Sequence, residues 1–115
     1  LNNPINQRFV EDFRKTYNRI PTLYASQGYD TALLLDAAIK AVGGDLSKKD
    51  ELRKAMLAGF NSTRGPVRFS PNGYPIQNYY LRQVIQQPGG EIVNRQVGTI
   101  FTNHRDAYVD RCKLR

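Results

Sequence analysis

The feature that most restricts the fold of this chain is a helical segment with no clear polar side. The stretch Ala32–Val42 is apolar nearly all round, and only Asp36 and Lys40 interrupt it. Its spacing predicts the second half of a helix over about Leu23–Val42, ending at Gly43-Gly44 because glycine adopts the left-handed angles of a helix cap. A helix that is apolar on most sides is normally a buried helix. We therefore expect it to have packing partners on several sides.

Two further helices are predicted from their end signals. The first should begin at Asn3-Pro4, because asparagine caps a helix and proline suits its first position. It should end before Pro21, since the residue before a proline avoids helical angles. The third should be capped by Ser47, with Asp50 as an acidic version of the capping box, and should close at Gly59. The first helix carries an apolar stripe made of Ile5, Phe9, Phe13 and Tyr17.

The pattern then changes from helical to strand-like. Residues 67–69 alternate apolar and polar, and Pro71-Asn72-Gly73 marks a tight turn. A strand is predicted over Asn78–Gln86, and Glu91–Phe101 should return beside it as an antiparallel hairpin. The polar stretch from Thr102 onward has no period, so we expect it to be loosely held.

The net charge of +7 does not by itself indicate a nucleic-acid partner. Most basic residues are scattered along the chain, and only Arg105, Arg111 and Lys113–Arg115 approach a cluster. A basic, solvated surface is the favoured interpretation. A small nucleic-acid-binding domain stays open as a weaker alternative, and a strong loss of binding with added salt would identify it.

The residues offer little for catalysis or metal binding. His104 is the only histidine, and it lies in the polar tail, where we expect a surface residue. Cys112 is the only cysteine, which excludes an internal disulfide and a cysteine-rich zinc site. An exposed thiol or an intermolecular bridge is expected for it. No nucleophile elbow, phosphate loop or dinucleotide motif occurs. We therefore expect no enzyme, no catalytic residue, no metal ligand and no cofactor.

Two tyrosines near the start of the second predicted helix have two interpretations. Tyr24 and Tyr29 flank Ala25-Ser26-Gln27-Gly28. A helix start offers free N–H groups and partial positive charge to a carboxylate, and tyrosine adds a flat wall with a hydroxyl tip. They could form the edge of a small-ligand pocket, or they could pack into the interior. The residues alone favour interior packing.

Taken in order, these features resemble the leucine/isoleucine/valine-type extracellular ligand-binding proteins of ABC transporters. The resemblance covers about residues 3–87, and the segment after Glu91 matches the pattern poorly. It rests on these motifs: Asn3-Pro4, Phe9, Phe13, Tyr17, Pro21, Tyr24-Ala25, Gly28-Tyr29-Asp30-Thr31-Ala32, Gly43-Gly44, Leu52, Gly65-Pro66-Val67-Arg68-Phe69, Asn72-Gly73 and Tyr80-Leu81.

The resemblance implies an α/β fold, namely the C-terminal segment of a type I periplasmic-binding fold, with about three helices followed by an antiparallel hairpin. Residues 1–75 would complete the first lobe, and residues 76–101 would form the crossover and hairpin leading toward the second lobe. Residues 102–115 would be a polar basic tail. The chain opens with Leu1 and shows no signal peptide, as expected of an excised or processed piece.

The resemblance also implies a function. The chain would belong to the solute-binding component of an ABC transporter, located in the periplasm or anchored outside the membrane. It would bind amino acids or related small carboxylates, including aromatic ones, by lobe closure, and deliver them to the membrane subunits of the transporter. The aromatic residue before the Gly-Tyr-Asp segment corresponds to Tyr24, with Ser26 and Gln27 as neighbouring candidates for ligand contact. Tyr29 and Asp30 are expected to serve packing and hinge geometry.

The same resemblance explains the apolar second helix, which would lie against a parallel sheet contributed mostly by other parts of a longer protein. The isolated segment should then be prone to form a homodimer that covers this helix. A ligand-sensing receptor ectodomain of the same fold remains an alternative to the transport protein. A membrane helix downstream would identify that receptor.

Overall fold

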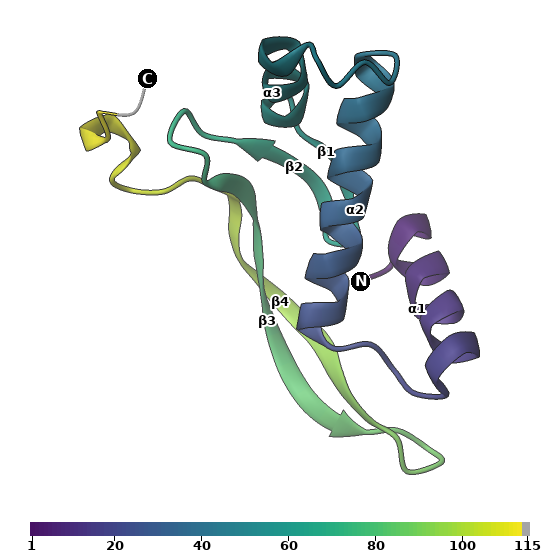
Figure 1. The fold of residues 1–115 in the computed structure, drawn as a ribbon. Helices are drawn as coiled ribbons and strands as arrows, with labels where there is room; N and C mark the ends of the chain where they lie inside the picture. The colour runs from purple at the N-terminus through teal and green to yellow at the C-terminus, as the bar shows by residue number, and fades with distance from the viewer. Residues whose placement is uncertain (114–115) are drawn as a thin grey trace.

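The computed structural model describes residues 1–113, and it contains three helices and one antiparallel sheet (Figure 1). The helices are α1 (Pro4–Tyr17), α2 (Leu23–Ala41) and α3 (Lys49–Leu57). The strands are β1 (Phe60–Ser62), β2 (Gly65–Phe69), β3 (Pro75–Gln86) and β4 (Ile92–His104), which lie side by side in this order. A short 3-10 helix, η1 (Val109–Arg111), follows the sheet.

The starts of the first two helices follow from their capping residues. The Asn3 side chain accepts a hydrogen bond from the N–H of Asn6 at 2.8 Å, and a proline occupies the first helical position, as predicted. Thr22 caps α2 in the same way, through a 3.4 Å bond from the N–H of Ala25. Helix α1 ends at Asn18, which has a φ of 51°, before Pro21 is reached.

The predicted cap of the third helix is wrong. Lys48 occupies the N-cap position of α3 without any side-chain bond to the helix. Ser47 is turned toward the preceding loop, where its hydroxyl and its N–H both donate to Asp45 Oδ1, at 2.6 and 3.0 Å. These two bonds favour the ionised carboxyl, so they lower the pKa of Asp45. The Asp45 carboxylate thus closes a local turn with Ser47, and the Ser47 side chain is directed toward that turn and not toward the start of α3.

The sheet is larger than the predicted hairpin. The hairpin itself is confirmed, since β3 and β4 pair antiparallel, but β3 starts at Pro75 and β4 continues to His104. The short strand β1 was not predicted, because three residues are too few to show a period. It pairs with β2 and is held by a tight turn in which the Ser62 hydroxyl donates to the carbonyl of Gly65.

The tail is also more ordered than predicted. Thr102, Asn103 and His104 still belong to β4, and His104 is exposed, as expected. Further along, Val109 in η1 is buried. The expectation of a loosely held tail is therefore wrong for these residues, because residues 102–104 extend the strand that pairs with β3 and the apolar side chain of Val109 is buried. Arg115, the last residue of the basic cluster, lies outside the described residues, as does Leu114.

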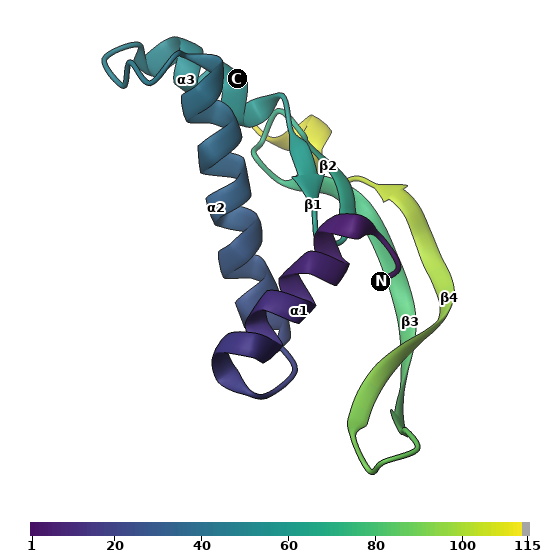
Figure 2. The same cartoon turned by 90° about the vertical axis from the view of Figure 1, so that its right-hand side faces the viewer.

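An ion pair joins the far end of the hairpin to helix α1. Both carboxylate oxygens of Glu91, in the turn before β4, accept from the same atom, Arg14 Nη2 in the last turn of α1, at 2.7 and 2.6 Å. Both side chains remain roughly half exposed. Figure 2 shows the hairpin of β3 and β4 extending away from β1 and β2, beyond the ends of α1 and α2. The hairpin therefore depends on few side-chain contacts outside its own two strands.

The chain buries little apolar surface for its size. Its accessible surface is 8776 Å², whereas a compact monomer of this mass exposes about 6,400 Å². Its radius of gyration is 16.7 Å, compared with about 13 Å for a compact domain of this length. In the described part of the chain, the buried apolar residues are Phe9, Ala38, Val42, Val67 and Val109. This part of the chain is thus an open assembly with a small core.

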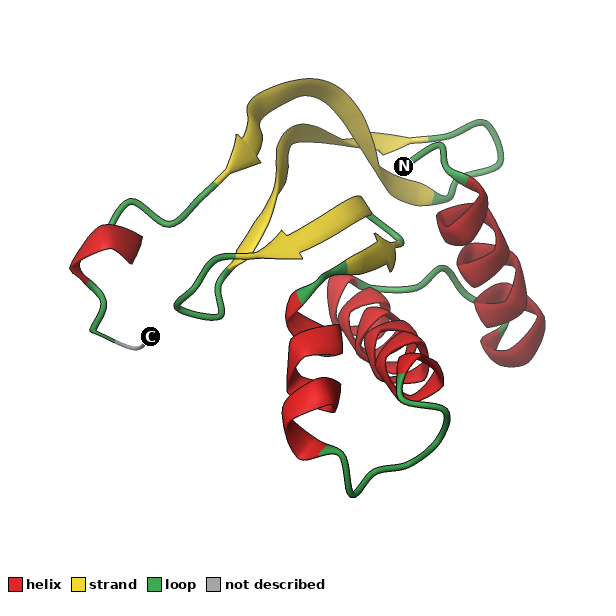
Figure 3. Ribbon diagram, turned by 90° about the horizontal axis from the view of Figure 1, so that it is seen from above, coloured by secondary structure: helices red, strands yellow, loops and turns green. Residues whose placement is uncertain are grey.

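Helix α2 is the element left most incompletely covered. Seen from above, the helices lie on one side of the sheet, and α2 is contacted by α3 and β1 (Figure 3). Within α2 only Asp30 and Ala38 are buried, while Leu35 and Ile39 are 42% and 37% exposed. The described residues therefore leave much of this apolar helix without the packing partners that its sequence predicts.

Candidate functional site

The start of α2 presents an exposed aromatic side chain. Tyr24, in the first turn of the helix, is 81% exposed. Tyr29, one and a half turns later, is half-buried, and its ring lies 4.8 Å from the ring of Phe9 in α1. Interior packing, which the residues alone favoured for both tyrosines, is therefore right for Tyr29 and wrong for Tyr24. An exposed tyrosine of this size is available to contact another molecule or another segment.

The two polar candidates near Tyr24, Ser26 and Gln27, point to different sides of α2. Gln27 is exposed and lies three positions after Tyr24, so the two residues share one face of the helix. Ser26 lies two positions after Tyr24, so it points to a different side. Its hydroxyl also donates to the carbonyl of Leu23 at 2.8 Å. The structure thus brings Tyr24 and Gln27 together and separates Ser26 from them.

A mixed polar and apolar cavity of about 430 Å³ opens between α2 and the sheet. Two polar atoms on its walls, Arg64 Nε and Gln77 Oε1, are buried and have no hydrogen-bond partner among the described residues. Sequence reasoning did not single out Arg64 or Gln77, because neither belongs to a motif with known chemistry. The walls are formed by Gln27, Asp30, Thr31 and Leu34 of α2, and by Phe60, Arg64, Val67, Phe69, Pro75 and Gln77 from the sheet side.

A buried carboxylate fixes the position of α2 relative to the sheet. Asp30 is 3% exposed and accepts two hydrogen bonds from Thr63, from its N–H at 2.7 Å and from its hydroxyl at 3.1 Å. The guanidinium of Arg64 lies 3.4 Å from the same carboxylate. The carbonyl of Thr63 in turn accepts a bond from the Asn3 side chain at 2.9 Å. This network joins α1, α2 and the β1–β2 turn, which confirms the packing role expected for Asp30.

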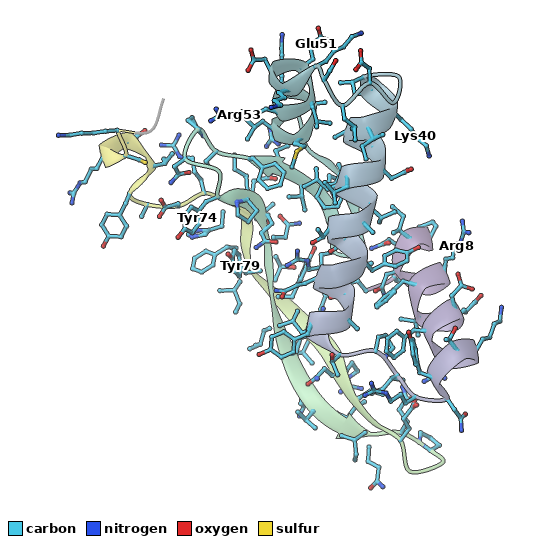
Figure 4. The ribbon with its side chains drawn as sticks, in the orientation of Figure 1. Arg8, Lys40, Glu51, Arg53, Tyr74 and Tyr79 are labelled. Carbon is cyan, nitrogen blue, oxygen red and sulfur yellow. The ribbon has the colours of Figure 1, made fainter. Side chains whose placement is uncertain are left out.

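The charged surface residues are dispersed. Figure 4 shows Arg8 on α1, Lys40 on α2 and Arg53 on α3 at separate edges of the molecule. Within residues 1–113, no cluster of histidine, cysteine, aspartate or glutamate side chains has the makeup of a metal site. The helices in this range are also too short or too polar to cross a membrane. The features that remain for function are the exposed tyrosine at the start of α2 and the cavity beside that helix.

Solved structures share this fold over nearly the whole chain. A solute-binding protein of an ABC transporter from Rhodopseudomonas palustris, in complex with benzoate, is 43% identical over 99% of this chain, with a TM-score of 0.81. A substrate-binding protein from Sphaerobacter thermophilus is 28% identical over 90% of the chain, with a TM-score of 0.82. A third, from Rhodopseudomonas palustris BisB5 with 3,4-dihydroxybenzoic acid, is 30% identical over 92%, with a TM-score of 0.78.

The chain spans only part of these proteins, about 30% of the length of the first and 29% of the other two. No curated protein sequence matches it. The sequence model of the family described as periplasmic binding protein does match, over residues 1–91. That range includes all three helices, the first three strands and the exposed Tyr24. On this sequence match and the shared fold, the chain belongs to the periplasmic binding protein family.

Proposed function

We propose that this chain is part of the solute-binding component of an ABC transporter, and that its ligands are small aromatic carboxylates of the benzoate class. The observation that carries the proposal is the 43% identity over nearly the whole chain to a protein whose structure contains benzoate. The protein with 3,4-dihydroxybenzoic acid supports the same ligand class. Amino acids are the other ligand class that the resemblance implies, and a binding experiment with both kinds of ligand distinguishes them from benzoates.

In the proposed mechanism, ligand binding closes two lobes over the solute without covalent chemistry. Residues 1–75 would complete the first lobe, and residues 76–101 would lead toward the second. Tyr24 supplies a flat wall for an aromatic ring, and Gln27 supplies a polar group on the same face of α2. The free N–H groups and partial positive charge at the start of α2 favour the carboxylate. Ser26 remains a weaker candidate, because its hydroxyl is already bonded to the helix.

The proposed partners follow from the same role. The ligand-loaded protein would dock on the membrane subunits of the transporter, and it would act in the periplasm or anchored to the outer face of the membrane. No catalytic step is part of this role. Membership of the periplasmic binding protein family supports the location.

Replacing Tyr24 with alanine in the full-length protein is expected to weaken benzoate binding by about tenfold or more, because a stacked aromatic pair is lost. Isothermal titration calorimetry with benzoate, 4-hydroxybenzoate and leucine measures this change and also establishes the ligand class. Tyr24→Phe should keep most of the affinity. Tyr74→Ala is the matched control, since Tyr74 is 62% exposed but lies in the loop before β3. Equal losses in both alanine variants would contradict the role of Tyr24.

The isolated 115-residue chain is expected to form a homodimer that covers α2. Its surface exceeds that of a compact monomer by roughly 2,400 Å², while a standard interface buries about 800 Å² per partner. Sedimentation velocity over a range of concentrations measures the association. The double change Leu35→Glu and Ile39→Glu should abolish it, whereas Val84→Glu on the exposed hairpin should not. A monomer at every concentration would contradict this proposal.

A further inference from the structure

An ion pair joins the helices to the hairpin, two parts of the chain that otherwise have few contacts with each other. In residues 1–113, β3 and β4 contact mainly each other and β2. The turn between them nevertheless reaches α1, where Arg14 Nη2 donates to both carboxylate oxygens of Glu91 at 2.7 and 2.6 Å. These two residues lie 77 positions apart in the sequence. Of the ion pairs within residues 1–113, this alone joins residues 1–75 to residues 76–101.

The backbone that connects these two parts has an irregular strand pairing. In β3, Ile76 pairs with β2, whereas the residues from Gln77 onward pair with β4. The register of that pairing shifts between Gln77 and Arg82. In the same part of β4, Asn103 has a φ of 50°, and its N–H donates to the side-chain oxygen of Asn78 at 2.8 Å. Bulges bend a strand and interrupt its ladder, so the hairpin can turn here with the least loss of backbone hydrogen bonds.

The ion pair lies at the end of the molecule that carries the candidate ligand contacts. Arg14 is in the last turn of α1, and Tyr24 is in the first turn of α2, so the two residues flank the connection between these helices. Two perpendicular views show this connection and the hairpin turn at the same end of the chain (Figures 1 and 2). A contact between α1 and the hairpin turn is therefore well placed to affect ligand binding.

We propose that Arg14 and Glu91 are positioning residues, whose ion pair links the two lobes and favours the closed arrangement that holds the ligand. This inference rests on the proposed function, in which residues 1–75 and residues 76–101 lie on opposite sides of the closing movement. Groups on opposite sides come together when the lobes close, so a contact between them stabilises the closed arrangement more than the open one. A less populated closed arrangement weakens the apparent affinity for the ligand in proportion.

The experiment reverses each charge in the full-length protein and measures benzoate binding by calorimetry. Arg14→Glu and Glu91→Arg should each raise the dissociation constant by about two- to fivefold, the size expected when an exposed ion pair is lost. The double change, Arg14→Glu with Glu91→Arg, restores a pair of opposite charges and should recover most of the affinity. High salt should reduce the differences between the variants, because it screens exposed charges. The melting temperature without ligand should change little in any of them.

The Glu91→Arg variant distinguishes this role from a direct contact between Arg14 and the ligand. The added positive charge would by itself favour an anionic ligand, whereas loss of the ion pair weakens binding. Tighter benzoate binding by Glu91→Arg would therefore overturn the inference.

Arg8→Glu is the matched control, because Arg8 is exposed on the same helix (Figure 4) and its ion pair, with Asp12, lies within α1. It should leave benzoate affinity unchanged. If the unchanged protein binds no aromatic acid, the proposed function and this inference both fail. If it binds benzoate and the two reversed variants bind it equally well, only this inference fails. Equal weakening by Arg8→Glu, or no recovery in the double variant, would assign the effect to net charge or local damage and would also overturn it.

Discussion

Replacement of Asp30 by alanine is expected to lower the free energy of unfolding by several kcal/mol, because it removes a buried carboxylate that pairs with the partly exposed Arg64 and accepts two hydrogen bonds from Thr63. The change removes both acceptors used by Thr63 and leaves the Arg64 guanidinium without its carboxylate. A buried N–H that loses its acceptor adds the desolvation cost of that group. Urea unfolding followed by circular dichroism measures the loss.

Two comparison variants separate the contributions at Asp30. Asp36→Ala is the matched control, because Asp36 lies in the same helix and pairs with Lys40 on an exposed surface. Asp36→Ala should lower the free energy of unfolding by less than about 1 kcal/mol, because exposed ion pairs contribute little to stability. The double change Asp30→Ala and Arg64→Leu should recover part of the loss, since no unpaired charge remains. An Asp30→Ala variant as stable as the Asp36→Ala variant would contradict the structural role of this network.

Replacement of Gly59 by alanine is expected to lower the free energy of unfolding about as much as Asp30→Ala does, but for a steric reason. Gly59 ends the segment between α3 and β1 with a φ of 93°, which side-chain-bearing residues rarely adopt. An added Cβ would overlap the carbonyl oxygen of Val67 and lie 3.1 Å from the Cα of Arg68, both in the backbone of β2. Backbone atoms paired in a sheet cannot move aside cheaply. We expect a loss of several kcal/mol in unfolding free energy, measured in the same urea series.

Gly65 provides the control for Gly59. It has a similar φ of 105°, but an added Cβ there would meet no atom of residues 1–113 within 4 Å. Gly65→Ala should therefore show the conformational strain alone, about 1–3 kcal/mol. The difference between the two variants measures the steric clash with β2. Equal losses would mean that the approach of Gly59 to Val67 contributes nothing.

Local signals predicted most of the secondary structure. The start and the end of α1 depend on residues that are close in sequence. Asn3 and Pro21 therefore predicted where this helix lies without any knowledge of tertiary contacts. The hairpin was predictable because β3 and β4 are neighbours in sequence and are joined by a short turn. The Ser47 cap failed because two local partners were available, and the choice between them depends on the conformation of the whole loop.

The candidate site was only partly predictable. Tyr24 and Gln27 were identified from the motif near the start of α2, and the structure places them on one exposed face. The Asp30, Thr63 and Arg64 network was not predicted as a unit, because its members lie 33 and 34 residues apart and meet only after the sheet forms beside α2. No local pattern records such a pairing.

The sequence by itself determined where the helices and the hairpin form and that α2 is too apolar to stand alone, because periodicity and end signals depend on neighbouring residues. Only the tertiary structure decided which faces are covered. It showed that Asp30 is buried against the β1–β2 turn, and that residues 1–113 leave Leu35 and Ile39 exposed. Burial depends on contacts between residues that lie far apart in the sequence. Such contacts cannot be predicted from periodicity or from the signals at helix ends.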